Sequence, residues 1–237
     1  MEAKDKLIVA LDVESIERAM ELVDELSSEV ELFKIGIAPF TDFGYTILEK
    51  LQTLGKKVFL DLKVHDIPNT VANAARAAVK KDIFMMNFHC LGGLRMLQAA
   101  VKGTDEGCRG SDRQEPLLLG VTILTSMAKE DMESLGIAGE VQDKVLELAQ
   151  LAKKAGLDGV VASAQEARLI KERIGKDFIV VTPGIRPEWA QTEDQKRTLT
   201  PKEAIAEGAD YIVVGRPIIE AENPREAAKR IIKEIGE

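Results

Sequence analysis

The chain has 237 residues, of which 45% are hydrophobic and 30% charged, so it can bury a large core and remain soluble. Its length suits one large α/β domain better than a small bundle or sandwich. A formal net charge of −8 argues against a general nucleic-acid or membrane surface, because such surfaces are basic. Any phosphate group that the protein binds must be met by local cations.

The cysteines and the N-terminal segment indicate a cytoplasmic protein. Cys90 and Cys108 form no CxxC pair and have no zinc-ligand spacing, so neither a disulfide framework nor a structural metal is expected. The apolar stretch of MEAKDKLIVALD has about six residues, too few for a signal-peptide core or a membrane span.

Short apolar runs alternate with amphipathic segments along the chain, which is typical of repeated βα units with parallel strands. Doubly wound sheets usually stop at about five or six strands, whereas eight βα units of this length close into a barrel. The sequence therefore predicts the α/β class and a (β/α)8 TIM barrel, in a single domain spanning residues 1–237. The expected strands, each followed by a helical segment, are 6–12, 31–37, 57–63, 83–89, 117–123, 158–162, 178–182 and 210–214.

Two longer segments separate the predicted strands and helices. Residues 102–115, KGTDEGCRGSDRQE, contain three glycines and few groups to bury, so they predict an exposed connection before the fifth strand. Residues 184–199 follow the seventh strand and should lie at the carboxyl-terminal face, where barrel enzymes hold their active sites. This second segment is the candidate lid.

The third strand and its loop, KVFLDLKVHDIPNT at residues 57–70, carry the strongest chemical signal. Alternate side chains of a strand share one face, so Phe59, Asp61 and Lys63 should point into the barrel while the intervening apolar residues face the helices. Asp66 follows in the loop. An isolated Asp-x-Lys pair is more often a structural ion pair, because ionised groups inside a protein must be paired.

Two further charges favour a catalytic cluster over a structural pair. Asp12 ends the first strand in LIVALD, and Lys34 lies on the second strand in LFKIG. Four neighbouring charges rarely gather for packing alone. Carboxylates on either side hold a lysine protonated, which makes Lys63 a candidate proton donor.

The loops after the seventh and eighth strands match the usual phosphate-binding position of a barrel. TPGIR (182–186) and YIVVGRPI (211–218) each contain a glycine and an arginine. Arg186 and Arg216 can each form a bidentate contact with phosphate oxygens, and Gly215 allows the backbone to approach closely. A single VGR segment would equally suit a strand end with a surface arginine, but two such loops favour a phosphate site.

Polar residues also end the fourth and fifth strands. Thr125 and Ser126 in VTILTS offer hydroxyl groups to a polar ring edge, although such a pair is more often a helix cap. His89 closes the fourth strand in NFHCLGG, and we interpret it as a hydrogen-bonded core residue rather than a base.

These motifs resemble the orotidine 5'-phosphate decarboxylase family over essentially the whole chain. The flanking motifs ALD, FKIG, LTS, TPGIR and VGRPI resemble that family too, as does DQ at Gln195. The NFHCLGG segment and the 103–115 connection depart from the usual pattern, but neither touches a proposed contact. The signature Asp-x-Lys-x-x-Asp-Ile-Pro-x-Thr is complete here as Asp61, Lys63, Asp66, Ile67, Pro68 and Thr70.

The resemblance implies decarboxylation of orotidine 5'-phosphate to uridine 5'-phosphate, without a metal or other cofactor. Lys63 would donate the proton within an alternating network of Lys34, Asp61 and Asp66. The resemblance also implies a homodimer in which Asp66 and Thr70 reach the site of the partner subunit. The implied substrate contacts are Asp12, Lys34, Asp61, Ile67, Thr70, Thr125, Ser126, Pro183, Arg186, Gln195, Gly215 and Arg216.

Two alternative functions remain open at this stage. Related barrels that act as decarboxylases or aldolases on sugar phosphates reuse a similar acid and lysine cluster with a magnesium ion. Here the second strand carries Lys34 where such an enzyme would need an additional carboxylate. A non-catalytic nucleotide-binding barrel would keep the phosphate loops, but every proposed catalytic residue is also present.

Overall fold

The computed structural model describes residues 2–110, 112–190 and 199–236, and within them eight parallel strands close into a barrel. The strands follow one another in chain order, and β8 pairs with β1 to complete the ring. The predicted TIM barrel is therefore confirmed. The strands are β1 Leu7–Ala10, β2 Leu32–Gly36, β3 Lys57–Val64, β4 Met85–His89, β5 Leu117–Val121, β6 Gly159–Val161, β7 Ile179–Thr182 and β8 Tyr211–Val214.

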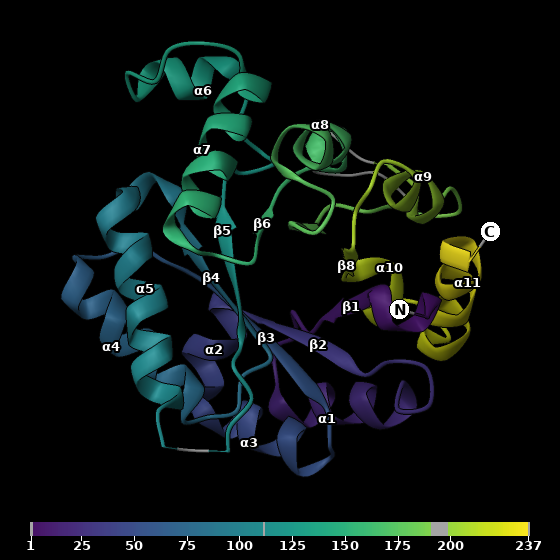
Figure 1. The fold of residues 1–237 in the computed structure, drawn as a ribbon. Coiled ribbons are helices and arrows are strands. Elements are labelled where there is room, and N and C mark those ends of the chain that lie inside the picture. The colour runs from purple at the N-terminus through teal and green to yellow at the C-terminus, as the bar shows by residue number, and fades with distance from the viewer. Residues whose placement is uncertain (1, 111, 191–198, 237) are drawn as a thin grey trace.

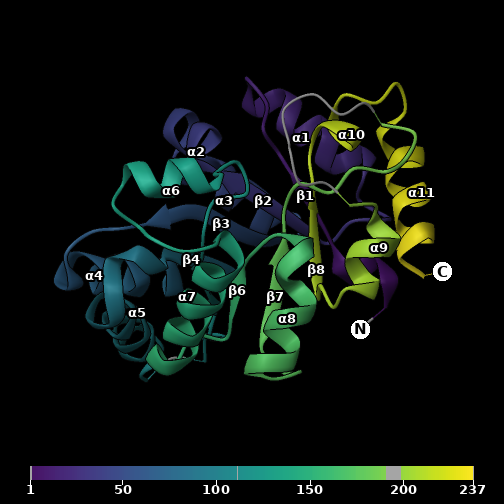
Figure 2. The ribbon, with the colours of Figure 1, turned by 90° about the horizontal axis from the view of Figure 1, so that it is seen from above.

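Helices surround the barrel and follow every strand, as the sequence predicts (Figure 1). Three short helices lie toward the same end of the barrel, where the strands finish (Figure 2): α2 Ile37–Phe43, α6 Lys129–Ser134 and α10 Arg216–Ile219. Short 3-10 helices, η1 Ala3–Lys6 and η2 Cys90–Gly92, precede β1 and follow β4. The remaining helices are α1 Ile16–Glu25, α3 Tyr45–Thr53, α4 Pro68–Val79, α5 Gly93–Cys108, α7 Val141–Ala155, α8 Ala164–Ile174, α9 Pro201–Ala206 and α11 Pro224–Gly236.

Helix ends form where the sequence supplies partners for the free backbone groups. Ser15 accepts a hydrogen bond from the backbone N–H of Arg18 and so caps α1. Thr200 and Glu203 form a reciprocal capping box at the start of α9. Gly156 ends α7 with φ of 95°, a left-handed conformation that glycine adopts without a Cβ clash.

Two apolar layers stabilise the barrel. The larger layer lies between the strands and the helices and includes Val58 and Leu60 of β3. The smaller layer comes from the opposite faces of the strands, fills the barrel interior and includes Phe59. The predicted alternation along the third strand is therefore confirmed for these residues, and it leaves Asp61 on the interior side.

The expected exposed connection at residues 102–115 is wrong over its first half. α5 continues to Cys108, and both Gly103 and Thr104 are buried. A Cβ at Gly103 would lie 2.2 Å from the backbone oxygen of Ala72, so this glycine allows α5 to pack closely on α4. Gly103, one of the glycines that suggested a turn, is instead required by helix packing.

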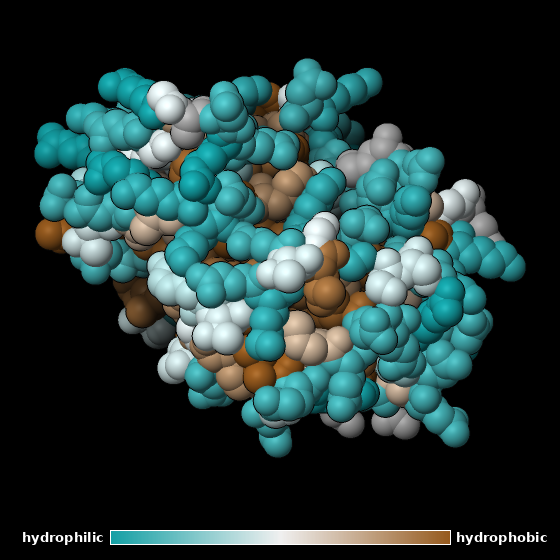
Figure 3. Space-filling view, turned by 90° about the horizontal axis from the view of Figure 1, so that it is seen from below, coloured by the Kyte–Doolittle hydropathy of each residue, from teal (hydrophilic) through white to brown (hydrophobic). Residues whose placement is uncertain are grey.

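The surface of the molecule is mostly hydrophilic on the face in view, as the high content of charged residues predicts. Hydrophilic side chains cover most of the face in Figure 3, and hydrophobic ones reach the surface mainly near its middle. Among the described helices, none is long and apolar enough to cross a membrane.

We predict that Gly103→Ala destabilises the protein by about 1–3 kcal/mol, the usual cost of overpacking, because a backbone oxygen cannot move aside as a side chain can. This cost exceeds the gain of about 1 kcal/mol in helix propensity. Urea denaturation measures the difference. Gly236→Ala on α11 is the control, since its Cβ would meet Ala3 Cβ at 3.7 Å, an ordinary contact. Equal stability of Gly103→Ala and the wild type would contradict the close packing of α4 and α5.

Candidate active site

Four charged side chains meet at the carboxyl ends of β1, β2 and β3. The strand register pairs Ala10 with Lys34 and Gly36 with Asp61, which brings these strand ends side by side. Lys34 Nζ lies 3.5 Å from Asp12 Oδ1 and 3.4 Å from Asp61 Oδ2. Lys63 Nζ lies 2.7 Å from Asp61 Oδ1. The structure thus joins these residues in an alternating chain of acid and base, although β1 ends two residues before Asp12.

The centre of this charged cluster is buried and its ends are accessible. The side chains of Lys34 and Asp61 are each 11% exposed, whereas those of Lys63 and Asp12 are 31% and 55% exposed. Burial alone would raise the pKa of Asp61, but Lys34 and Lys63, with hydrogen bonds from Lys63 and Asn87, hold the pKa of this carboxyl below its ordinary value. Asp61 is therefore ionised at neutral pH.

The backbone of β3 is irregular at Lys63. The pairing of β3 with β4 shifts between Leu60 and Val64, and Lys63 has a φ of 50°. A bulge of this kind redirects a side chain at the edge of an active site. Asn87 of β4 accepts a hydrogen bond from the Lys63 backbone N–H at 2.7 Å and donates one to Asp61 Oδ1 at 2.6 Å. Asn87 is not among the residues predicted from the sequence, although a polar residue within the apolar strand MMNFH was an available signal.

Two adjoining cavities open beside the charged cluster. The first has a volume of about 200 Å³ and combines apolar walls with Lys63, Thr125 and Ser126. The second has a volume of about 430 Å³ and is lined by Asp12, Gly215 and other polar residues. Both are bordered by Lys34, Asp61, Pro183 and Val213. The charged cluster thus lies between a mainly apolar compartment and a polar one.

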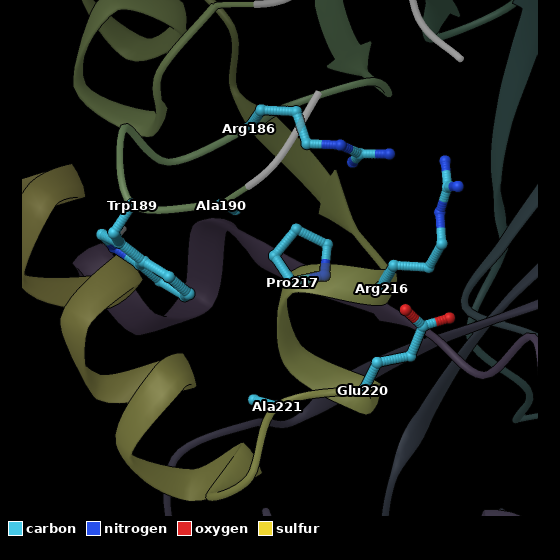
Figure 4. Close-up of a pocket in the computed structure, with 7 residues that line it drawn as sticks. All are labelled: Arg186, Trp189, Ala190, Arg216, Pro217, Glu220 and Ala221. Atoms are coloured by element: carbon cyan, nitrogen blue, oxygen red, sulfur yellow. The ribbon is translucent and has the colours of Figure 1, made fainter. Parts of the chain in front are cut away.

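The polar compartment leads to a further pocket of about 240 Å³. Arg186, from the segment after β7, and Arg216, at the start of α10, extend toward the same space (Figure 4). Glu220, which is not among the residues predicted from the sequence, also lines this pocket. The structure therefore brings the two predicted arginines together at one end of the connected cavities.

Trp189 fixes the start of the candidate lid to α11. Its indole Nε1 donates a hydrogen bond to Glu234 Oε1 at 3.1 Å, and Arg230 lies over its ring at 4.4 Å from the centroid. Residues 191–198 of the candidate lid, including the predicted phosphate contact Gln195, lie outside the described residues.

Three of the predicted site residues, Asp66, Ile67 and Thr70, do not line the described cavities of this chain. Asp66 is exposed and accepts a hydrogen bond from the backbone N–H of Ile67 at 2.6 Å. Ile67 is 67% exposed, and Thr70 lies exposed in the first turn of α4. A single chain therefore leaves this segment facing outward.

His89 makes the kind of contact expected of a structural histidine. Its Nδ1 accepts a hydrogen bond from the backbone N–H of Leu91 at 3.4 Å, and its ring stacks on His65. Burial and the nearby His65 and Lys63 lower the pKa of His89, which favours the neutral ring at pH 7. Among the described residues, no three His, Cys, Asp or Glu side chains are placed to hold a metal ion. The absence of a metal stays a prediction.

The chain matches a known protein family over nearly its whole length. Residues 5–231 match the model of the "Orotidine 5'-phosphate decarboxylase / HUMPS family". The chain belongs to this family. A relative named orotidine 5'-phosphate decarboxylase from Carboxydothermus hydrogenoformans is 50% identical, over 98% of this chain and 96% of its own length. Another of that name, from Heliobacterium modesticaldum, is 46% identical over 100% of this chain and 98% of its own.

Solved structures agree with the family assignment. The crystal structure of orotidine 5'-phosphate decarboxylase from Lactobacillus acidophilus superposes with a TM-score of 0.86 at 38% identity, covering 98% of this chain and 100% of that one. An uncharacterised conserved protein from Geobacillus kaustophilus has a TM-score of 0.85 at 37% identity, covering 97% and 99%. The resemblance inferred from the charged motif is therefore confirmed.

We predict that Asp61→Asn lowers the free energy of unfolding at neutral pH by about 1.5–3 kcal/mol, the usual contribution of a hydrogen bond to a charged group. A depressed pKa contributes stability above the ordinary aspartate pKa, and this contribution is lost as the pH falls through the folded-state pKa. The difference from the wild type should therefore shrink below about pH 4.

Urea denaturation across this pH range measures the difference between Asp61→Asn and the wild type. Asp177→Asn, the same chemical change at an exposed position, is the control and should alter stability by less than about 0.5 kcal/mol. A stability difference for Asp61→Asn that stays constant as the pH falls would contradict the assigned ionisation of Asp61.

Proposed function

We propose that this protein is an orotidine 5'-phosphate decarboxylase that forms uridine 5'-phosphate, the last step of uridine monophosphate biosynthesis. The family assignment supports a decarboxylase of this class. The observation that carries the proposal is the position of Asp61, buried between Lys34 and Lys63, beside cavities that lead to two arginines. The barrel would carry out this reaction as a single domain. The protein would act in the cytoplasm, as the sequence predicts.

The connected cavities match the parts of a nucleoside monophosphate. The pyrimidine ring would occupy the first cavity, with its polar edge at Ser126 and Thr125. The ribose hydroxyls would meet Asp12 and Lys34 at the junction. The phosphate would lie between the arginines beside the Gly215 backbone, because guanidinium groups bind phosphate oxygens in pairs. Pro183 would border the ring, and Gln195 would add a phosphate contact.

The reaction leaves an electron pair on C6 of the pyrimidine ring. The bond from C6 to the carboxylate carbon breaks, carbon dioxide departs, and the electron pair stays on C6, where no ring position delocalises it. The Lys63 ammonium would stabilise this charge and then transfer a proton to C6, and solvent would reprotonate the lysine. No cofactor takes part in this sequence of steps.

Repulsion between Asp61 and the substrate carboxylate cannot supply most of the rate enhancement. Two like charges about 4 Å apart repel by roughly 4 kcal/mol at an effective dielectric of 20. At about 1.4 kcal/mol for each factor of ten, this amounts to about three decades at most. Stabilisation of the transition state by Lys63 must therefore dominate, assisted by binding energy from the remote phosphate.

We also propose that the protein acts as a homodimer. Asp66, Ile67 and Thr70 face outward in the described chain, and the sequence resemblance predicts that Asp66 and Thr70 contribute to the partner's site. The exposed side chain of Ile67 supports an interface at this segment, because large apolar side chains are commonly buried in protein contacts.

The first test follows the absorbance of orotidine 5'-phosphate with the purified protein, with and without excess EDTA. We expect rapid substrate loss that the chelator does not change, because Lys63 supplies the charge that a metal would otherwise provide. Absence of turnover would refute the proposed reaction. Activity that disappears with EDTA and appears only on sugar phosphates would favour the magnesium-dependent alternative.

We predict that Lys63→Ala folds normally and lowers kcat/KM by more than about 1,000-fold, because it removes both electrostatic stabilisation and the proton donor. Lys57→Ala, at the amino-terminal end of β3, is the matched control and should keep wild-type activity. Circular dichroism verifies folding, and steady-state kinetics measure the loss. A folded Lys63→Ala variant with near-native turnover is incompatible with the proposed mechanism.

A further inference from the structure

Asn87 is a fully buried amide whose two hydrogen bonds both go to the charged cluster. It lies in the middle of β4 between the buried apolar residues Met86 and Phe88. Its Nδ2 donates to Asp61 Oδ1 at 2.6 Å, and its Oδ1 accepts from the Lys63 backbone N–H at 2.7 Å. A buried amide is costly unless it is hydrogen-bonded, and both ends of this one are used on catalytic residues of the proposed mechanism.

The hydrogen bond to Lys63 supports an uncommon backbone conformation. Between two paired positions, β3 advances from Leu60 to Val64 while β4 advances only from Met86 to Phe88. Within this irregular stretch Lys63 has a φ of 50°, a left-handed conformation that a non-glycine residue rarely adopts because its Cβ crowds the following carbonyl oxygen. The Asn87 side chain accepts a hydrogen bond from the Lys63 backbone N–H there. Because a change of backbone register redirects side chains, this contact sets where the lysine points.

The hydrogen bond to Asp61 keeps that carboxylate in place without adding charge. Asp61 Oδ1 accepts from both Asn87 Nδ2 and Lys63 Nζ, so the amide and the ammonium meet at one oxygen atom. An asparagine amide offers donors and an acceptor and carries no net charge. A negatively charged side chain in place of Asn87 would repel the Asp61 carboxylate. A positively charged one would compete with Lys63 for that carboxylate.

We propose that Asn87 is a positioning residue for the decarboxylation, fixing the Asp61 carboxylate and the Lys63 backbone so that the lysine ammonium faces the reacting carbon. This inference rests on the proposed function. Asn87 acts through Asp61 and Lys63 and does not itself line either cavity beside the charged cluster.

The sharpest test is Asn87→Asp, which keeps the size and the acceptor but replaces the donor with a carboxylate. When both acids are ionised they repel, and Asp61 and Lys63 are displaced. When the two carboxylates share one proton, the native charge and a hydrogen bond between the side chains are restored. Two carboxyl groups at one site raise one pKa strongly, so the variant should bind this proton well above the ordinary range of aspartate.

We expect Asn87→Asp to lower kcat by roughly 100-fold at about pH 8, the effect of a displacement near 1 Å, with KM nearly unchanged. Relative to the wild type, kcat should recover as the pH falls toward about 5 and the pair takes up its proton. Asn87→Ala removes both hydrogen bonds and cannot share a proton, so its kcat should be low at every pH.

Thr104→Val on α5 is the matched control for lost stability. It removes a buried hydroxyl that donates to the Ala100 backbone oxygen at 3.1 Å, far along the chain from the charged cluster. We expect it to lower the melting temperature and leave kcat and its pH profile unchanged. If Asn87→Asp and Asn87→Ala behave like Thr104→Val, with kcat close to wild type, then Asn87 has only a structural role and the proposal is overturned.

A measurement without substrate separates this inference from the proposed function. The melting temperature of Asn87→Asp should lie below that of the wild type at about pH 8, and the difference should narrow on acidification as the shared proton binds. A difference that is independent of pH would overturn the contact between Asn87 and Asp61. If the wild type fails to decarboxylate orotidine 5'-phosphate while this difference still narrows, the proposed reaction fails and the arrangement around Asp61 stands.

Discussion

The arrangement of the site depends on one buried carboxylate held between two ammonium groups. Asp61 alone would be costly in the barrel interior, and Lys34 alone would be equally costly, because an unpaired ion loses its hydration there. Together they are tolerated, and Lys63 joins them from the more exposed side. The pairing therefore places the Lys63 side chain beside an ionised carboxylate and next to a cavity, which is the arrangement that the proposed chemistry requires.

The barrel supplies the rigidity that this pairing needs. Adjacent parallel strands fix Lys34 and Asp61 through the backbone ladder, so their separation does not depend on flexible loops. Lys63 is different, because it lies in the irregular part of β3 and relies on a side chain of β4 for its orientation. The site thus combines a regular strand ladder, which positions Asp61, with a local irregularity of β3, which orients Lys63.

The eight strands and the charged cluster could be predicted from sequence because both follow from short-range patterns. Alternation along the third strand places Asp61 inside the barrel, and apolar runs locate the strands. The role of Asn87 could not be predicted in this way, because it depends on a register shift between two strands.

Gly103 was misinterpreted for a related reason, since a glycine that permits close helix packing has the same local signature as one in a turn. The proposed role of Asp66 rests on family resemblance, because the described chain leaves this side chain exposed.

The charge distribution around the polar compartment differs from that of the whole chain and suits the anionic substrate of the proposed reaction. The protein carries a formal charge of −8, whereas the lining of this compartment balances Lys34, Arg186 and Arg216 against Asp12, Asp61 and Glu220. An anion should therefore be repelled less in this compartment than at the acidic surface around it, and the two guanidinium groups offer it direct contacts. The arginines line the polar compartment, whereas Lys63 lines the mainly apolar one. In the proposed complex, binding energy from a phosphate at the arginines would therefore hold the reacting ring against Lys63 without placing a competing anion beside it.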